Sequence, residues 1–206
     1  MSKTLSVSGI HVSRETMDRL ELYRDLLRHW NPKINLVSPG TLSDAWTRHM
    51  EDSAQILAHA SGSPTTWTDL GSGGGFPGMV IAIIMAETSP STKVKLIESD
   101  IRKCTFLRTV AREAGIRPDI QTKRIEAAVP SNADVVTARA LAPLNTLLGY
   151  VSRHLATTGR AYLPKGENWQ AEVQTAQESW HFTLITHKSK TNPNAVVLEI
   201  GEIIHV

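Results

Sequence analysis

Several features that would indicate a function class by themselves are missing from this 206-residue sequence. Cys104 is the single cysteine, which excludes an intramolecular disulfide and a zinc site built from several cysteines. The longest apolar run, residues 79–86, is much too short to cross a bilayer. Residues 1–6 lack the charged and then apolar pattern of a signal peptide. We therefore expect a protein of the reducing cytoplasm, with no membrane segment and no metal centre.

The charge of the sequence is small and unevenly distributed. The formal net charge is +2 at pH 7, which by itself does not require a nucleic-acid partner. Residues 1–62 carry as many basic as acidic side chains, whereas basic side chains dominate between residues 102 and 124. The basic members of that stretch are Arg102, Lys103, Arg108, Arg112, Arg117, Lys123 and Arg124. They indicate either a surface that faces phosphates or a solvated helix face with its flanking loops.

The first 62 residues have the periodicity of helices. Apolar side chains recur at spacings of three and four from Met17 to Trp30, which predicts one amphipathic helix. Asn31-Pro32 is expected to end that helix, because proline disfavours helical geometry in the residue before it. A second helix is predicted to begin near Ser43-Asp44, where both residues are good helix caps. The Ser-Gly-Ser-Pro sequence at 61–64 is the expected hinge to the rest of the chain.

From residue 66 onward, short strands alternate with helices. Such alternation predicts βαβ units and a mostly parallel sheet. The predicted strands are Thr66–Leu70, Val94–Ile97, Ile120–Thr122, Ala133–Ala138, Arg160–Leu163, Phe182–Thr186 and Val196–Ile200, the last two as an antiparallel pair. The predicted helices are Gly78–Glu87, Arg102–Ala114 and Leu144–Leu155. We expect residues 1–62 to form a helical cap and residues 63–206 an α/β domain, packed together as one compact unit.

A glycine-rich segment after the first of these strands is the clearest indication of a ligand. Residues 69–78 read Asp-Leu-Gly-Ser-Gly-Gly-Gly-Phe-Pro-Gly, and Glu98 ends the next strand. Glycines permit a tight turn and a close approach of a ligand to the backbone. An acid about 20 residues beyond such a loop is the usual partner of a ribose diol. The pattern therefore predicts a cofactor that contains a nucleoside.

Two classes of cofactor fit this loop. Residues 73–78 satisfy G-x-G-x-x-G literally, so a NAD-type oxidoreductase on a Rossmann-like fold is one interpretation. Three features favour a methyltransferase that uses S-adenosylmethionine: the strand ends at Asp69, a long segment precedes the loop, and an antiparallel pair closes the chain. A glycine-rich turn without a ligand is disfavoured, because so many glycines cost backbone entropy.

Further motifs lie on both sides of the loop, between about residues 17 and 166. They are Trp30–Ser38, Arg48–Ser53, Gly71–Gly78, Lys103–Leu107, Thr137–Ala140 and Leu163–Gly166. In this order they resemble the glucose-inhibited division protein B family, which methylates N7 of a guanine in bacterial 16S ribosomal RNA. The resemblance implies the class I S-adenosylmethionine-dependent methyltransferase fold: a doubly wound, mostly parallel, seven-stranded sheet with an N-terminal helical cap. Many relatives have threonine in place of Ser72 and aspartate in place of Glu98, and a glutamate can still hold a ribose diol.

The resemblance also assigns roles to individual residues. It implies that S-adenosylmethionine is bound by Asp69, Gly71, Gly73, Gly75, Phe76, Glu98, Ile125, Glu126 and Arg139. Arg139 and Lys165 are the implied catalytic cations. The substrate nucleotide is expected to contact Asn35, Arg48, His49 and Lys165. Core packing for Phe76, an ordinary salt bridge for Arg139, and capping or packing for Asn35 and His49 stay open as alternatives.

The implied chemistry needs little acid–base assistance. N7 of guanine has a lone pair and no proton, so no general base is required. The protein has to align N7 with the methyl carbon at about 3 Å and keep water out. The expected partner is 16S rRNA or the small ribosomal subunit, and we expect a monomer. A small-molecule methyltransferase, the oxidoreductase named above and a non-enzymatic RNA-binding module are the alternative functions.

Overall fold

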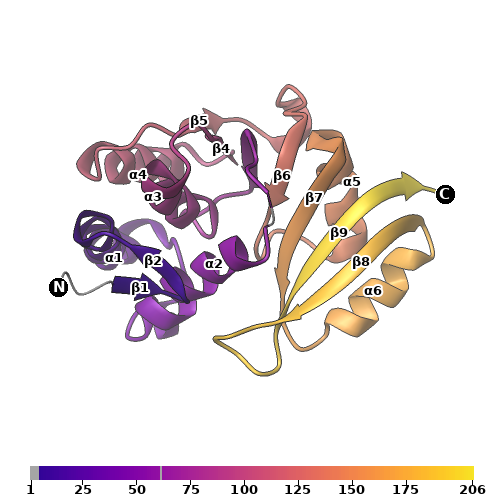
Figure 1. Cartoon of the computed structure of the whole chain (residues 1–206), viewed down its shortest axis with the longest axis horizontal. Coiled ribbons are helices and arrows are strands. Elements are labelled where there is room, and N and C mark those ends of the chain that lie inside the picture. Colours follow the sequence, from indigo (N-terminus) through magenta and orange to yellow (C-terminus); the bar gives the residue numbers. More distant parts are fainter. Residues whose placement is uncertain (1–4, 61) are drawn as a thin grey trace.

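The computed structural model describes residues 5–60 and 62–206 of the chain (Figure 1). Residues 1–4, part of the segment expected not to be a signal peptide, and Ser61 of the predicted hinge lie outside the described residues. The main sheet has seven strands in the order β5-β4-β3-β6-β7-β9-β8. They are β3 (Thr66–Leu70), β4 (Lys93–Glu98), β5 (Asp119–Thr122), β6 (Ala133–Thr137), β7 (Leu155–Lys165), β8 (Trp180–Lys188) and β9 (Val196–His205).

The directions of the strands define where a ligand can bind. Strands β3 to β7 pair in parallel, and β9 runs antiparallel to both β7 and β8. The strand order reverses at β3, which has β4 on one side and β6 on the other. In open α/β sheets ligands bind beyond the carboxyl ends of the strands at such a point. The predicted sheet is thus confirmed, and the residues that follow β3, β4 and β6 are the candidates for a site.

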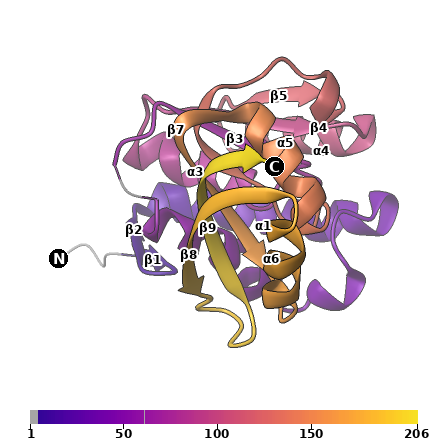
Figure 2. The same ribbon diagram turned by 90° about the vertical axis from the view of Figure 1, so that its right-hand side faces the viewer.

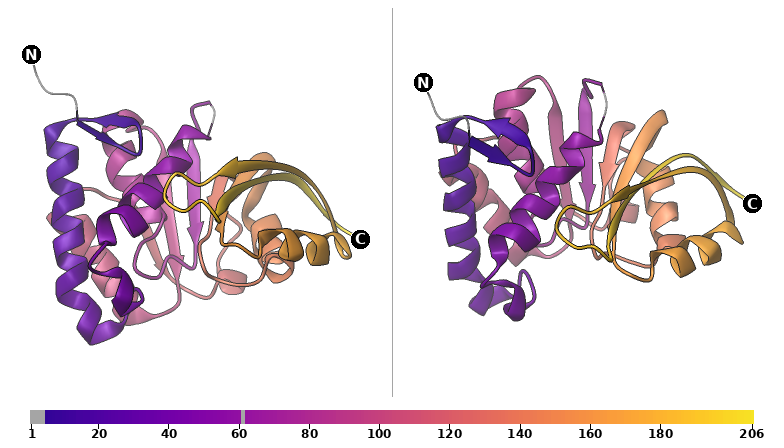
Figure 3. Two further views of the ribbon diagram at one scale, coloured as in Figure 1. Left: turned by 90° about the horizontal axis from the view of Figure 1, so that it is seen from below. Right: turned by 60° about the horizontal axis from the view of Figure 1, so that its bottom comes forward.

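Helices cover both faces of the sheet (Figures 1 and 3). They are α1 (Arg14–Ile34), α3 (Gly78–Thr88), α4 (Ile101–Glu113), α5 (Leu144–His154) and α6 (Trp169–Gln177). Successive strand residues enter different cores, because side chains alternate across a sheet. Val135 and Tyr162 pack in the core that contains α1, α3 and α4, whereas Val136 and Leu163 pack in the core that contains α5 and α6.

The N-terminal segment is joined to the sheet through the first of these cores. Tyr23 and Leu27 of α1 are fully buried there together with Trp67, Met79 and Phe106 from the other side of the predicted boundary. The core therefore continues across residue 62, and a division of the chain at that point stays a sequence-based prediction. Two short strands that the sequence did not indicate, β1 (Leu5–Val7) and β2 (Ile10–Val12), form a hairpin before α1.

The end of α1 differs from the prediction. The helix does not stop at Asn31-Pro32 but continues to Ile34, with Pro32 inside it. Proline removes one backbone donor from the last turn, and the helix nevertheless continues beyond it, so the predicted end is wrong by three residues or fewer. The side-chain oxygen of Asn31 accepts hydrogen bonds from the backbone N–H groups of Leu36 and Val37, which satisfies the chain beyond the helix. Asn35 ends the helix in a left-handed conformation, with φ of 48°.

The predicted second helix is also different, because it is broken into several pieces. A 3-10 turn spans Pro39–Thr41, a π-helical segment spans Trp46–Glu51, α2 covers Asp52–Ala54, and a second 3-10 turn covers Gln55–Ala58. The helical path begins close to the predicted Ser43-Asp44 start, since the N–H of Arg48 donates to the carbonyl oxygen of Asp44 at 3.0 Å. Segments of π-helix occur often at functional sites.

The C-terminal part holds a further element that the sequence reading missed. Helix α6 packs beside β8 and is visible in Figure 2, which views the molecule from the side of the C-terminal strands. Helix α5 ends at His154, so Leu155 belongs to β7 and not to the helix. Over residues 5–60 and 62–206, no helix has the length and apolar character needed to span a membrane, and no cluster of metal-ligating side chains is found.

Candidate active site

The glycine-rich turn joins β3 to α3, and its glycines have different tasks. Gly71, Gly73 and Gly75 all have positive φ. A Cβ on Gly75 would lie 2.8 Å from Cβ of Met79 and 2.9 Å from a methyl carbon of Leu107, so Gly75 is required by packing. A Cβ on Gly73 would have only the carbonyl oxygen of Gly71 within 4 Å, at 3.7 Å. Open space thus lies next to the backbone at Gly73, as a close-lying ligand requires.

Asp69, at the end of β3, is completely buried beneath this turn. Its Oδ1 accepts a hydrogen bond from Oγ1 of Thr137 at 2.8 Å, and its Oδ2 has no hydrogen-bond partner among the residues that the structure describes. Burial raises the pKa of Asp69 to about 6, and the hydrogen bond from Thr137 opposes that rise. Asp69 supports the turn from below and does not line a cavity, so direct contact with a cofactor stays a prediction.

The first of two adjoining cavities, with a volume of about 680 Å³, lies at the carboxyl edge of the sheet above the turn. It brings together most of the residues predicted to bind the cofactor and two of those predicted for the substrate. The predicted residues in its lining are Asn35, His49, Gly71, Gly73, Phe76, Glu98, Ile125, Glu126 and Arg139. Asp69, Gly75, Arg48 and Lys165 are not part of it.

The acid at the end of β4 is tied to the glycine-rich turn. Oε2 of Glu98 accepts a hydrogen bond from the N–H of Gly73 at 2.9 Å, and Oε1 accepts one from Asp100 at 2.8 Å. Glu98 is buried and faces the first cavity. Ile125, also in the lining, is buried just after β5. An acid, an apolar wall and open backbone at Gly73 fit a nucleoside cofactor such as S-adenosylmethionine.

Phe76 forms part of the same wall and sits within a stack of flat groups. Its ring lies 5.2 Å from that of Tyr23 and 4.8 Å from that of His49, with interplanar angles of 16° and 28°. The guanidinium carbon of Arg139 lies 5.0 Å from the centre of the Phe76 ring. Tyr23 in turn donates a hydrogen bond to the carbonyl oxygen of Gly74. Phe76 therefore serves both the core and the cavity.

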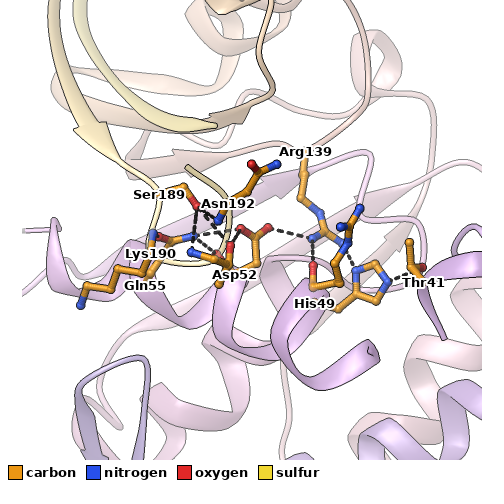
Figure 4. A network of polar contacts seen from close by, with 10 residues as sticks. Thr41, His49, Asp52, Gln55, Arg139, Ser189, Lys190 and Asn192 are labelled. Atoms are coloured by element: carbon orange, nitrogen blue, oxygen red, sulfur yellow. Dashed lines mark hydrogen bonds and ion pairs between the residues drawn. The ribbon is translucent and has the colours of Figure 1, made fainter. Parts of the chain in front are cut away.

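The guanidinium of Arg139 is held by three acceptors from one short segment (Figure 4). Its Nη1 donates to a carboxylate oxygen of Asp52 at 3.0 Å and to the carbonyl oxygen of Arg48 at 3.1 Å. Its Nη2 lies 3.0 Å from Nδ1 of His49. The salt bridge that the sequence left as an alternative for Arg139 does form. The side chain also borders the first cavity, so Arg139 can form this salt bridge and line the predicted site at the same time.

These contacts fix the protonation of His49. Arginine can only donate, so Nδ1 of His49 accepts and carries no proton. Nε2 then carries the proton and donates to Oγ1 of Thr41 at 2.8 Å, while that hydroxyl donates to the carbonyl oxygen of Ser38 at 2.7 Å. Burial and the neighbouring charges of Arg139 and Arg48 lower the pKa of His49 to about 4. His49 is therefore neutral near pH 7.

A second cavity, of about 690 Å³, adjoins the first. Arg139, Ala140 and Leu141 line both, so this segment forms a partition between them. The second cavity contains the predicted substrate residues Arg48 and Lys165. Ala140 has φ of 51°, a left-handed conformation that residues with a side chain rarely adopt. Such backbone strain often accompanies functional sites.

Lys165 is more constrained than the sequence suggested. Its Nζ donates to a carboxylate oxygen of Glu172 at 2.7 Å and to the carbonyl oxygen of Ala142 at 3.2 Å. The same oxygen of Glu172 accepts from the N–H of Leu144, the first residue of α5. Lys165 thus links β7 to the start of α5 through a residue of α6, the helix that the sequence reading missed. A direct role in catalysis stays a prediction.

Sequence reasoning missed several polar residues at this edge. Asp52, Gln55, Ser189 and Thr191 line the second cavity. Asp52 falls within the Arg48–Ser53 motif, which was a usable signal. Ser189 and Thr191 lie in a turn between two strands, and nothing in their sequence placed that turn beside Asp52.

Comparisons with known proteins agree with this arrangement. The family model described as rRNA small subunit methyltransferase G matches residues 16–196. A ribosomal RNA small subunit methyltransferase G from Ruegeria sp. (strain TM1040) is 50% identical over 191 residues, 93% of each chain. Another, from Ruegeria pomeroyi, is 47% identical over 197 residues, 96% of each chain. A solved TehB-like SAM-dependent methyltransferase from Corynebacterium glutamicum shares the fold, with a TM-score of 0.58 at 12% identity over 88% of this chain and 98% of that one.

The comparisons decide between the interpretations that the glycine-rich loop left open. A match to a methyltransferase family leaves no support for an oxidoreductase that uses a dinucleotide. The resemblance drawn from the motifs is confirmed, because the family model spans most of the sequence and the two relatives align over nearly their whole length. The chain belongs to the GidB family, the rRNA small subunit methyltransferase G family.

Proposed function

We propose that this protein transfers the methyl group of S-adenosylmethionine to N7 of a guanine in 16S rRNA, in the cytoplasm and as a monomer. One observation carries the proposal: two cavities of about 680 and 690 Å³ meet at a single partition, Arg139–Leu141. Both volumes are in the range of ligand sites in proteins. Methyl transfer requires donor and acceptor to meet, and a shared wall at the carboxyl edge of the sheet is the place where two ligands can do so.

The first cavity is the proposed site of the cofactor. Glu98 is available for the ribose hydroxyls, Ile125 for one face of the adenine, and the open backbone at Gly73 for close contact. Glu98 already accepts two backbone hydrogen bonds, so a ribose hydroxyl would be an additional donor to its remaining lone pairs. Phe76 closes this cavity toward the core.

The second cavity is the proposed site of the target nucleotide. Arg48 is exposed beside it, and Asn35 is exposed at the first cavity, with its side chain free of hydrogen bonds to the described residues. The basic side chain of Arg48 suits a phosphate, and the amide of Asn35 suits the edge of a base. Lys103, Lys123 and Arg124 also border the first cavity, which supports a contact between part of the basic stretch and a phosphate backbone.

The reaction asks the protein to orient two groups. The chemistry that S-adenosylmethionine supplies is a methyl group on positively charged sulfur: the N7 lone pair forms the new bond, the electron pair of the broken carbon–sulfur bond stays on sulfur, and the positive charge moves to the guanine. Arg139 is the cation that we place at the guanine O6. Two of its five N–H groups, on Nε and Nη2, have no acceptor among the described residues.

Arg139 suits this task better than Lys165. The guanidinium borders both cavities, whereas Lys165 borders the second one alone and already has two acceptors. We therefore propose Arg139 as the residue that contacts the reacting base. Lys165 contributes by holding the wall at Ala142 and the start of α5.

The proposal is tested by binding and by transfer. Calorimetry with S-adenosylhomocysteine should show one site per chain, and NAD should show none. Tritiated S-adenosylmethionine should then label 16S rRNA, free or in small subunits, prepared from cells that lack this protein. Label that enters neither RNA preparation, despite binding of S-adenosylhomocysteine, would refute the rRNA substrate and favour a small-molecule acceptor.

A further inference from the structure

The turn between β8 and β9 lies at the same edge of the sheet as the two cavities. Val196, the first residue of β9, pairs with Lys165 at the carboxyl end of β7 and with Lys188 at the end of β8. The turn that joins these strands, residues 189–195, is therefore placed beyond the carboxyl ends of the parallel strands. Figure 3 shows it beside the segment that contains α2.

Two residues of the α2 segment hold this turn. Gln55, which is fully buried, accepts a hydrogen bond from the N–H of Lys190 at 2.8 Å and donates to the hydroxyl of Ser189 at 3.3 Å. Asp52 accepts a hydrogen bond from the hydroxyl of Thr191 at 2.7 Å. Side-chain hydrogen bonds thus hold the turn against the α2 segment, although the two are more than 130 residues apart in sequence.

The two carboxylate oxygens of Asp52 accept hydrogen bonds from three side chains. Oδ1 accepts from Thr191 and from the amide of Gln55, while Oδ2 accepts from Nη1 of Arg139. The side chains of Asp52 and Arg139 are 18% and 17% exposed, so the pair is only partly screened by water. Figure 4 shows the resulting continuous chain of contacts from the turn through Asp52 to Arg139 and His49.

We propose that Asp52 is a positioning residue that fixes the guanidinium of Arg139 against the turn between β8 and β9, and so sets the partition between the two cavities. This inference rests on the proposed function. Thr191 and Gln55 hold the other oxygen of the Asp52 carboxylate, so the carboxylate cannot move together with the guanidinium. The Arg139 side chain is therefore restricted to one position. Positioning of this kind lowers the entropy that must be lost before transfer.

The pair also has an electrostatic consequence. Methylation at N7 leaves the guanine with a positive charge, and an unpaired guanidinium next to it would oppose that change. Asp52 balances the charge of Arg139 and leaves its remaining N–H groups free to donate. Loss of the carboxylate should therefore reduce kcat more than it affects the KM for RNA or the affinity for S-adenosylhomocysteine.

The first test needs no substrate. In protein with labelled arginine guanidinium nitrogens, Arg139 should give slow rotation about its Nε–Cζ bond by NMR in the wild type. In Asp52→Asn this rotation should become fast, whereas it should stay slow in Glu51→Gln. Glu51 is the matched control, because it is the neighbouring acid with similar burial and its side chain makes no hydrogen bond or ion pair with the described residues. Equal rotation rates in all three proteins would overturn the proposal.

The second test is a double-mutant cycle with Asp52→Asn and Arg139→Gln, measured by methyl transfer. Asp52→Asn should lower kcat by roughly tenfold or more and leave S-adenosylhomocysteine affinity unchanged, with a moderate fall in melting temperature from the lost ion pair. The double variant should be no slower than Arg139→Gln alone, because Asp52 acts through Arg139. Multiplied losses would show that Asp52 acts independently and would overturn the proposal. Thr191→Val should cause a smaller loss in the same direction.

The outcomes separate this inference from the proposed function. If the wild type labels no rRNA while the guanidinium rotation responds to Asp52→Asn, the proposed function fails and the positioning role stands. If the wild type labels rRNA and Asp52→Asn labels it equally fast, the proposed function stands and the positioning role fails.

Discussion

Nη2 of Arg139 lies 3.0 Å from Nδ1 of His49, and this contact requires that His49 be neutral with its proton on Nε2. Phe76 lies against both groups, 4.8 Å from the His49 ring and 5.0 Å from the Arg139 guanidinium carbon. The cavity wall is therefore a packed unit in which a cation, a neutral imidazole and an aromatic ring fix one another.

The first prediction concerns the titration of His49. Its folded-state pKa is about 4, against 6.5 for the ordinary group. As the pH falls from about 6.5 to about 4, the unfolded chain takes up a proton that the folded one does not, so stability declines in that window. His49→Gln should flatten this part of the pH–stability curve. NMR of the imidazole nitrogens should show the Nε2–H form from pH 5.5 to 8, and a protonated ring at pH 6 would contradict the assignment.

The second prediction compares two glycines of the same turn. Gly75→Ala should lower the free energy of unfolding by roughly 2–5 kcal/mol, because its Cβ collides with Met79 and Leu107 at a positive φ. Gly73→Ala should cost about 1–2 kcal/mol for its backbone conformation alone. Its methyl group would enter the first cavity and weaken S-adenosylhomocysteine binding. Calorimetry and urea unfolding measure both effects, and a Gly73→Ala protein that binds as tightly as the wild type would remove Gly73 from the cofactor site.

The third prediction concerns the buried acid Asp69. Its pKa rises from 3.8 to about 6 on folding, which corresponds to about 3 kcal/mol of destabilisation once the pH exceeds both values. The folded state binds the additional proton, so the contribution to stability falls as the pH rises from about 4 to about 6. As the pH rises through that window, the wild type should therefore lose stability relative to Asp69→Asn, as measured by the free energy of unfolding of each protein. A difference that is constant with pH would show that Asp69 titrates normally.

The fourth prediction separates the two cations proposed from the sequence. Lys165→Met should reduce stability by about 1–3 kcal/mol, because it removes the partner of Glu172 near the start of α5, and the folded variant should keep most of its methyl transfer. Arg139→Gln should instead lower transfer to a small residual rate that single-turnover measurement still detects, with little change in S-adenosylhomocysteine affinity. Thermal unfolding and single-turnover transfer measure the two properties, and the reverse pattern would make Lys165 the catalytic cation.

Sequence patterns predicted the part of this molecule that local rules determine. The alternation of strands and helices predicted the sheet, and the Asp69–Gly78 segment with Glu98 indicated the place of the first cavity, because each depends on a short stretch of chain. The breaks between Trp46 and Ala58 were missed because apolar spacing and caps do not distinguish an α-helix from π-helical and 3-10 turns. The partners of Asp52 were missed because Thr191 is brought to it by strand register, which spacing in the sequence does not encode.

The proposed function depends most directly on the atom that receives the methyl group. Borohydride and aniline cleave RNA at N7-methylguanine, so 16S rRNA from cells lacking this protein can be incubated with the protein and S-adenosylmethionine and then cleaved. The proposed function predicts a cut at one guanine with the wild type, and a much weaker cut at the same guanine with Arg139→Gln. Incorporation of tritiated methyl without any new cut would contradict it, because the methyl group would then be on another atom.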